Sequence, residues 1–145
     1  MSETILLVED SEDDVFFMER AIRLSEVKIH LQVVRDGQSA VDYLGGVREY
    51  ADRKTYPIPS LVLLDLKLPK VLGLDVLRWI RSRPELQTIP VIILTSSGER
   101  ADLERGYRIG ANSFMVKPSN ADDLLGLAKC LSDYWFKYNI LPRQA

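Results

Sequence analysis

The sequence predicts an α/β fold in which a parallel sheet of five strands carries helices on both faces. Five short apolar segments alternate with five amphipathic segments of helical spacing, and most links between them are short. The chain has 145 residues, of which 46% are hydrophobic, so it can bury one core without disulfides. We therefore expect a single doubly wound domain over residues 1–145.

Each predicted strand is a run of four or five residues, most of them apolar. The five runs lie at 4–8, 30–34, 61–64, 90–94 and 113–116. The first (TILLV), third (LVLL) and fourth (PVIIL) are almost wholly apolar, as strands covered on both faces require. The second (HLQVV) is more polar, which indicates a place near the sheet edge.

The helices are predicted from apolar spacing and from the residues at their ends. They cover 11–24, 38–44, 73–82, 99–109 and the segment after Asn120. Ser11 and Asn120 each lie three residues before an aspartate, which is the spacing of a capping box. Gly110 ends the fourth helix. The last helix carries an apolar stripe of Leu124, Leu127, Ala128, Leu131 and Trp135.

Two segments lie outside the alternation. Residues 45–60 contain Gly-Gly, three basic residues and two prolines, which predicts a long loop. Residues 134–145 form an aromatic C-terminal extension, with too many large side chains for a loose tail. This extension covers the domain's own edge or forms a dimer interface.

Composition argues against several classes of protein. The net charge of −2 disfavours a nucleic-acid-binding protein. One cysteine excludes an internal disulfide, and one histidine excludes a zinc site of three histidines. No apolar run approaches the roughly 18 residues of a membrane span, and the N-terminus lacks the pattern of a signal peptide. We expect a cytoplasmic protein with no membrane partner.

Chemically active side chains follow the predicted strands at their carboxyl ends. Glu9 and Asp10 follow the first strand, Asp65 the third, Thr95 the fourth and Lys117 the fifth. Parallel strands end at one edge of the sheet, and ligands bind there. We therefore expect these side chains to meet.

This set suits phosphoryl transfer to a carboxylate. Crowded carboxylates repel one another, and a divalent cation such as Mg²⁺ removes that cost. Asp65 is then the nucleophile that becomes an aspartyl phosphate. Lys117 and Thr95 offer a charge and a hydroxyl to the phosphoryl oxygens, and the backbone carbonyl of Lys67 is a further metal ligand.

The acidic run at 9–14 (EDSEDD) also has a structural interpretation. The three acids after Ser11, which are Glu12, Asp13 and Asp14, fall in the first helical turn, where the helix dipole favours negative charge. Glu9 and Asp10 precede Ser11, so the helix dipole does not explain them. Taken alone, each has about an even chance of being a solvated surface acid. The coincidence of reactive side chains at successive strand ends favours a functional site.

The pattern resembles the receiver domain of two-component response regulators. Four segments match in order and together cover almost the whole chain: LLVEDSEDD, LVLLDLKLPKVLGLDVL, IPVIILTSS and GANSFMVKPSNADDL. The resemblance implies a flavodoxin-like fold with strand order 2-1-3-4-5. It also implies that a sensor histidine kinase phosphorylates Asp65, and that the protein is a signalling switch rather than an enzyme.

The resemblance assigns roles to the remaining residues of the set. Glu9 and Asp10 hold Mg²⁺, or Mn²⁺ in its place, together with Asp65. Thr95 and Lys117 contact the phosphoryl group.

Two further expectations concern the fifth strand. The Lys117–Pro118 peptide is expected to be cis, an isomer that proline makes accessible. Phe114 stands where many receivers carry the switch tyrosine, and it is expected to turn inward when Thr95 moves toward the phosphoryl group.

A narrower resemblance is to stand-alone regulators that accompany phytochrome kinases. It rests on the loop 45–60, on DLKLPK and on DYWF at 133–136. It implies a homodimer formed through the helix at 99–109, the strand at 113–116 and the last helix, with the C-terminal extension taking part. No output domain is expected.

Other function classes stay open. A receiver-shaped scaffold or phosphate sink would use the same fold without signalling by phosphorylation. An aspartyl-phosphate hydrolase of the haloacid-dehalogenase type needs a second aspartate two residues after the nucleophile, where this chain has Lys67. A nucleotide- or flavin-binding module needs a Gly-rich loop after the first strand, where this chain has EDSEDD.

Overall fold

The sheet has five parallel strands in the order β2-β1-β3-β4-β5. A computed structural model describes residues 3–142 except 25, 27 and 97. The strands are β1 (Glu3–Val8), β2 (Ile29–Val34), β3 (Leu61–Leu64), β4 (Val91–Thr95) and β5 (Ser113–Val116). The chain passes from β1 outward to β2 and then returns to the other side of β1, so the strand order reverses between β1 and β3. The predicted fold class and strand order are confirmed.

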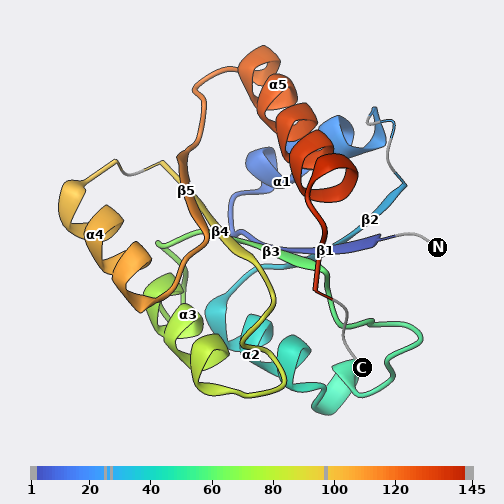
Figure 1. Cartoon of the computed structure of the whole chain (residues 1–145), viewed down its shortest axis with the longest axis vertical. Helices are drawn as coiled ribbons and strands as arrows, with labels where there is room; N and C mark the ends of the chain where they lie inside the picture. Colours follow the sequence, from blue (N-terminus) through green and yellow to red (C-terminus); the bar gives the residue numbers. More distant parts are fainter. Residues whose placement is uncertain (1–2, 25, 27, 97, 143–145) are drawn as a thin grey trace.

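Helices cover both faces of the sheet (Figure 1). One face carries α1 (Glu12–Arg23) and α5 (Ala121–Ser132), which contact each other. The other face carries α2 (Gly37–Gly45), α3 (Gly73–Ser82) and α4 (Arg100–Ile109). A short 3₁₀ helix covers Arg48–Tyr50, and a π-helical turn, Asp133–Tyr138, continues α5. In the part of the chain that the structure describes, no helix has the length and apolar character needed to cross a membrane.

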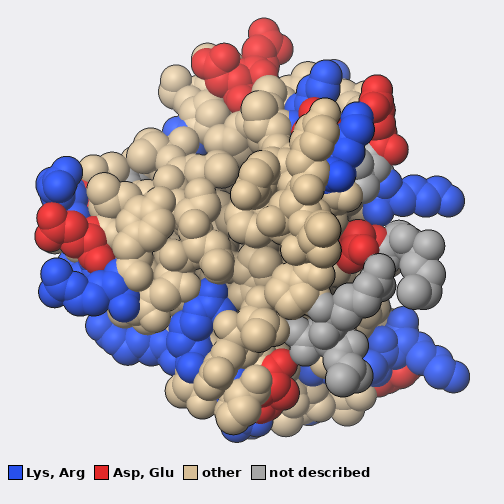
Figure 2. Space-filling model, in the orientation of Figure 1, with Lys and Arg blue, Asp and Glu red and all other residues tan. Residues whose placement is uncertain are grey.

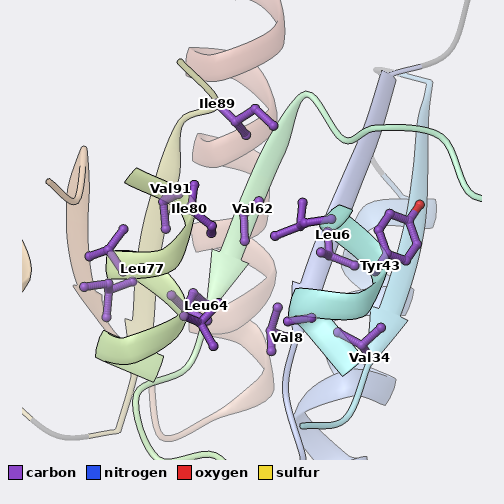
Figure 3. Close-up of a cluster of buried hydrophobic side chains, with 14 of the residues drawn as sticks. Leu6, Val8, Val34, Tyr43, Val62, Leu64, Leu77, Ile80, Ile89 and Val91 are labelled. Carbon is purple, nitrogen blue, oxygen red and sulfur yellow. The ribbon is translucent and has the colours of Figure 1, made fainter. Parts of the chain in front are cut away.

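The core consists of two layers, one on each face of the sheet. Successive residues of β1 point to opposite faces, so Leu6 and Val8 belong to the layer under α2 and α3. Figure 3 shows this layer, in which Val62 and Leu64 of β3 lie near the same helices. Strands β1, β3 and β4 are almost wholly buried, whereas β2 at the edge is largely half-buried. The polarity of the runs thus correctly predicted which strands are central.

The predicted N-caps of α1 and α5 are present. The backbone N–H of Asp14 donates to Ser11 Oγ (3.3 Å), and that of Asp123 donates to Asn120 Oδ1 (2.9 Å). These bonds satisfy N–H groups that have no partner within the helix. The bond to Ser11 fixes where α1 begins, directly after Glu9 and Asp10 at the end of β1.

The loop at 45–60 is ordered around a tyrosine cluster. The rings of Tyr43, Tyr50 and Tyr56 lie 5.0–5.8 Å apart, centroid to centroid. The guanidinium of Arg53 donates to the backbone oxygens of Tyr43 (2.8 Å), Leu44 (2.9 Å) and Tyr56 (3.2 Å). Two of these carbonyls, those of Tyr43 and Leu44, lie in the last turn of α2, and that of Tyr43 also accepts a hydrogen bond from the N–H of Gly46 (3.1 Å). Arg53 therefore ties the loop to the end of that helix.

Candidate functional site

Three carboxylates meet at the carboxyl ends of β1 and β3, where the strand order reverses. Glu9 and Asp10 follow β1, and Asp65 follows β3. One oxygen of each lies within 4.8 Å of the others. Glu9 and Asp65 are buried and Asp10 is exposed. A hard divalent cation prefers such a set of oxygen ligands, so the residues fit Mg²⁺ or Mn²⁺.

The two carboxylate oxygens of Asp65 have different neighbours. Oδ1 accepts a hydrogen bond from the backbone N–H of Leu66 (2.7 Å) and lies 3.5 Å from the backbone nitrogen of Lys67. Oδ2 lies 3.3 Å from Lys117 Nζ. The side chain is only 8% exposed. One oxygen of Asp65 is thus held by the backbone of its own loop, and the other lies beside the Lys117 ammonium.

Lys117 is the cationic centre of the site. Its Nζ contacts Glu9, and it lies 2.9 Å from Asp14 Oδ2 and 3.3 Å from Asp65 Oδ2. Burial alone would lower the pKa of Lys117, but hydrogen bonds to Glu9 and Asp14 and the charge of Asp65 outweigh burial and raise the pKa. Lys117 is therefore an ammonium at neutral pH, as an interaction with phosphoryl oxygens requires.

Glu9 is a buried carboxylate that depends on nearby donors. Burial raises its pKa, while hydrogen bonds from Lys117 and from the backbone N–H of Ser11 (3.1 Å) lower it. The charge of Asp65 raises the pKa further. A second positive charge beside Glu9 would favour its ionised form, which is what a bound divalent cation supplies.

Asp14 is a site residue that the sequence did not reveal. The sequence assigned it, with Glu12 and Asp13, to the favourable charge of a first helical turn. The structure shows that its carboxylate also reaches Lys117, 103 residues later in the chain. The sequence signal for Asp14 was its position four residues after Asp10, which is about one helical turn. Asp13, three residues after Asp10, fits that spacing almost as well.

Thr95 and Phe114 occupy the neighbouring strands. Thr95 is the last residue of β4 and is fully buried, and its backbone oxygen accepts from the N–H of Lys117 (2.8 Å). Phe114 is half-buried and packs against the α2–α3 core layer. Gly106 of α4 lies close to both strands, since a Cβ there would stand 2.8 Å from Ile93 Cδ1 and 3.4 Å from the Phe114 ring. Lys67 is exposed, and the role of its carbonyl stays a prediction.

The expectation of a cis peptide between Lys117 and Pro118 is wrong. Among the residues that the structure describes, all peptide bonds are trans. The trans isomer is intrinsically favoured before proline by about 0.5–1 kcal/mol. With this isomer Lys117 already reaches all three of its carboxylate partners, so the contacts of the ammonium do not require the cis form.

The fold and the carboxylate–lysine site define a receiver. The family model of the response regulator receiver domain matches residues 5–129, and the chain belongs to this family. It is 36% identical to "Response regulator Rcp1" of Synechocystis sp. over 138 residues, which are 95% of this chain and 92% of that protein.

Solved structures agree with this assignment. The phosphorylated cyanobacterial phytochrome response regulator RcpA superimposes with a TM-score of 0.93 at 35% identity, covering 99% of this chain and all of RcpA (100%). The Mn²⁺-bound form of Rcp1 gives a TM-score of 0.90 at 35% identity, covering 97% of this chain and 99% of Rcp1. The expected family is thereby confirmed.

Proposed function

We propose that this protein is a stand-alone response regulator that accepts a phosphoryl group on Asp65 from a sensor histidine kinase. The observation that carries this proposal is the geometry around Asp65. Its carboxylate lies within 4.8 Å of two further carboxylates that fit a divalent cation, and 3.3 Å from the Lys117 ammonium. Mg²⁺ held by Glu9, Asp10 and Asp65 would neutralise the charge that builds up during transfer.

In the transfer step, an oxygen of Asp65 attacks the phosphorus of the kinase's phosphohistidine. The O–P bond forms as the P–N bond breaks, and the histidine nitrogen keeps the electron pair and takes up a proton. Lys117 stabilises the phosphoryl oxygens from its position beside Asp65 Oδ2.

A direct test uses acetyl phosphate as the phosphodonor in the presence of Mg²⁺. Intact mass spectrometry should show one added phosphoryl group on the wild-type protein and none on Asp65→Asn. Asp13→Asn, which removes an exposed acid of the same α1 turn, should still be phosphorylated. An adduct that persists in Asp65→Asn would refute Asp65 as the acceptor. No adduct with any donor or kinase would favour the scaffold alternative.

The proposed switch couples Thr95 to Phe114. A phosphoryl group on Asp65 accepts a hydrogen bond from the Thr95 hydroxyl and draws the end of β4 inward, so the Phe114 ring turns toward the space that is vacated. Phosphorylation should then change amide hydrogen exchange in α4 and β5. Thr95→Ala should take up phosphate but lose that change. An unchanged exchange response in Thr95→Ala would contradict this coupling.

The proposed output is protein contact, including a homodimer through α4, β5, α5 and the C-terminal extension. Figure 2 shows few charged side chains across the middle of the view, around β5. Large apolar side chains are exposed on these elements: Tyr107, Val116, Leu125, Tyr134, Tyr138 and Ile140. Light scattering over a range of concentrations, with and without phosphorylation, tests this. A monomer mass under every condition would refute the dimer.

The proposed kinase is a phytochrome-type photoreceptor. Its support is the similarity to RcpA, which is described as a phytochrome response regulator. Beyond transfer to its own Asp65 and loss of that phosphoryl group, we assign no catalytic turnover to the protein. Lys67, at the position where a hydrolase of the haloacid-dehalogenase type has its acid–base aspartate, supports this assignment.

A further inference from the structure

Lys117 binds one carboxylate that does not belong to the candidate metal set. Its three described carboxylate partners are Glu9, Asp65 and Asp14. The first two share the cation position with Asp10, whereas Asp14 lies in the first turn of α1. The Asp14 contact, at 2.9 Å, is shorter than the Asp65 contact, at 3.3 Å.

A divalent cation and the Lys117 ammonium compete for the same oxygens. Both are positive, and both are attracted to Glu9 and Asp65. When a cation takes these carboxylates, the ammonium loses hydrogen-bond acceptors and is repelled. The Lys117 side chain is only 11% exposed, so water cannot fully replace the lost acceptors, and an unpaired buried charge is costly.

Asp14 offers the ammonium an alternative acceptor. Its side chain is 39% exposed, so it lies nearer to solvent than Glu9 or Asp65. A small cavity of about 10 Å³ lies beside Lys117 and is lined by Glu9 and Asp14, together with apolar side chains such as Leu7 and Met18. Asp65 and Asp10 do not line this cavity. The free space beside Lys117 is thus bordered by Asp14 and by only one of the three candidate cation ligands, Glu9.

We propose that Asp14 is a positioning residue for the cation site. It holds the Lys117 ammonium while a divalent cation occupies Glu9 and Asp65, and it thereby raises the affinity of the site for that cation. The inference rests on the divalent-cation part of the proposed function and assigns the role of an additional residue in it.

The side chain of Asp14 can be changed without removing the helix cap. The cap uses the backbone N–H of Asp14, which donates to Ser11 Oγ whatever the side chain is. Asp13→Asn is a matched control, because it removes the same charge from the same helical turn at an exposed position. Asp14→Glu keeps the charge and tests whether a carboxylate at this position is sufficient.

The experiment measures Mn²⁺ affinity by isothermal titration calorimetry in the absence of phosphodonor. We expect Asp14→Asn to bind Mn²⁺ roughly tenfold more weakly than wild type, the scale of one charge-assisted hydrogen bond. Asp13→Asn should stay within about twofold of wild type, because an exposed charge is screened by salt. Asp14→Glu should recover most of the lost affinity.

A double-mutant cycle with Lys117→Met separates action through Lys117 from simple loss of charge. When the ammonium is absent, Asp14→Asn should change Mn²⁺ affinity by less than about twofold. An equal loss of affinity with and without Lys117 would overturn the inference, as would wild-type affinity in Asp14→Asn. If Lys117→Met does not fold, Lys117→Gln completes the cycle, since it retains a polar group near Glu9.

The outcomes also separate this inference from the proposed function. Wild-type protein that binds Mn²⁺ but takes no phosphate from acetyl phosphate or a kinase would overturn the proposed function, and the cycle would still decide the role of Asp14. Normal phosphorylation with no coupling between Asp14 and Lys117 would overturn the inference alone. Wild-type protein that binds no Mn²⁺ would overturn both.

Discussion

Gly37 packs so closely against Val71 that no side chain fits between them. A Cβ on Gly37 would stand 2.0 Å from the carbonyl oxygen of Val71. The N–H of Gly37 donates to the carbonyl of Pro69 (3.3 Å), and Lys70 Nζ lies 3.6 Å from Asp36 Oδ2. The turn before α2 therefore supports the loop that follows Asp65, although the two segments are distant in sequence.

The first prediction concerns Gly37→Ala. The new methyl group must displace backbone rather than a flexible side chain, so we expect the free energy of unfolding to fall by about 1–3 kcal/mol. Urea denaturation followed by circular dichroism measures this. Gly126→Ala is the control, because a Cβ at Gly126 in α5 meets nothing within 4 Å. That change should stabilise the protein by roughly 0.5–1 kcal/mol. Stability loss of equal size in both variants would contradict the prediction.

The second prediction concerns the anchoring of the loop at 45–60 by Arg53. Arg53→Gln removes the charged donor to the backbone oxygens of Tyr43 and Leu44. We expect the loop to open more often and trypsin to cleave after Lys54 at least about tenfold faster.

Arg48→Gln is the control for this measurement. Arg48 pairs with Asp42 (3.1 Å), but its side chain is 71% exposed, and an exposed ion pair contributes little. Cleavage after Lys54 should change by no more than about twofold. A similar acceleration in both variants would show that Arg53 has no special role.

The third prediction concerns stability at alkaline pH. Burial raises the pKa of Tyr43 from its ordinary 10.0 to about 12. The folded state thus holds the phenolic proton more tightly than the unfolded state does. The stability that this provides is fully present below pH 10 and is lost as the pH rises toward 12, by about 2 kcal/mol in total.

Tyr43→Phe checks the source of this loss. The variant lacks the titrating group and also the hydrogen bond from Tyr43 Oη to the Pro57 carbonyl (2.8 Å). It should be less stable than wild type at neutral pH, and the difference should shrink between pH 10 and 12. Urea denaturation across this range measures both proteins. A constant difference would argue against Tyr43 as the titrating group.

The fourth prediction concerns stabilisation by Mg²⁺. A cation that binds only the folded carboxylate cluster should raise the free energy of unfolding by about 1–3 kcal/mol at ten to a hundred times its dissociation constant. Asp10→Asn removes one of the three oxygen ligands and should abolish most of this rise. Thermal unfolding with and without Mg²⁺ measures the effect, and Asp13→Asn should respond as wild type does. An equal response of Asp10→Asn would place the cation elsewhere.

Most of the fold could be predicted from local sequence signals. The bounds of the five strands and of the first four helices lie within one residue of those predicted. The caps at Ser11 and Asn120 and the stop at Gly110 were correct, because capping depends on residues a few positions apart. Burial of the central strands followed from their composition in the same way.

The candidate site could be predicted only in part. That Glu9, Asp10 and Asp65 would meet followed from the parallel arrangement of the strands, and the structure brings their oxygens together. The contact between Asp14 and Lys117 could not be predicted, because three neighbouring acids of the first turn are equivalent in sequence. The orientation of α1 relative to β5 brings Asp14 within reach of Lys117.

Local sequence signals were enough for the element order, the central strands and the residue types that collect at the sheet edge, because these depend on periodicity and on residues near in the chain. Long-range packing set which acid of the first α1 turn contacts Lys117 and how Arg53 anchors the loop at 45–60. Such features depend on ångström-scale distances between segments far apart in sequence. Packing of the whole domain sets those distances.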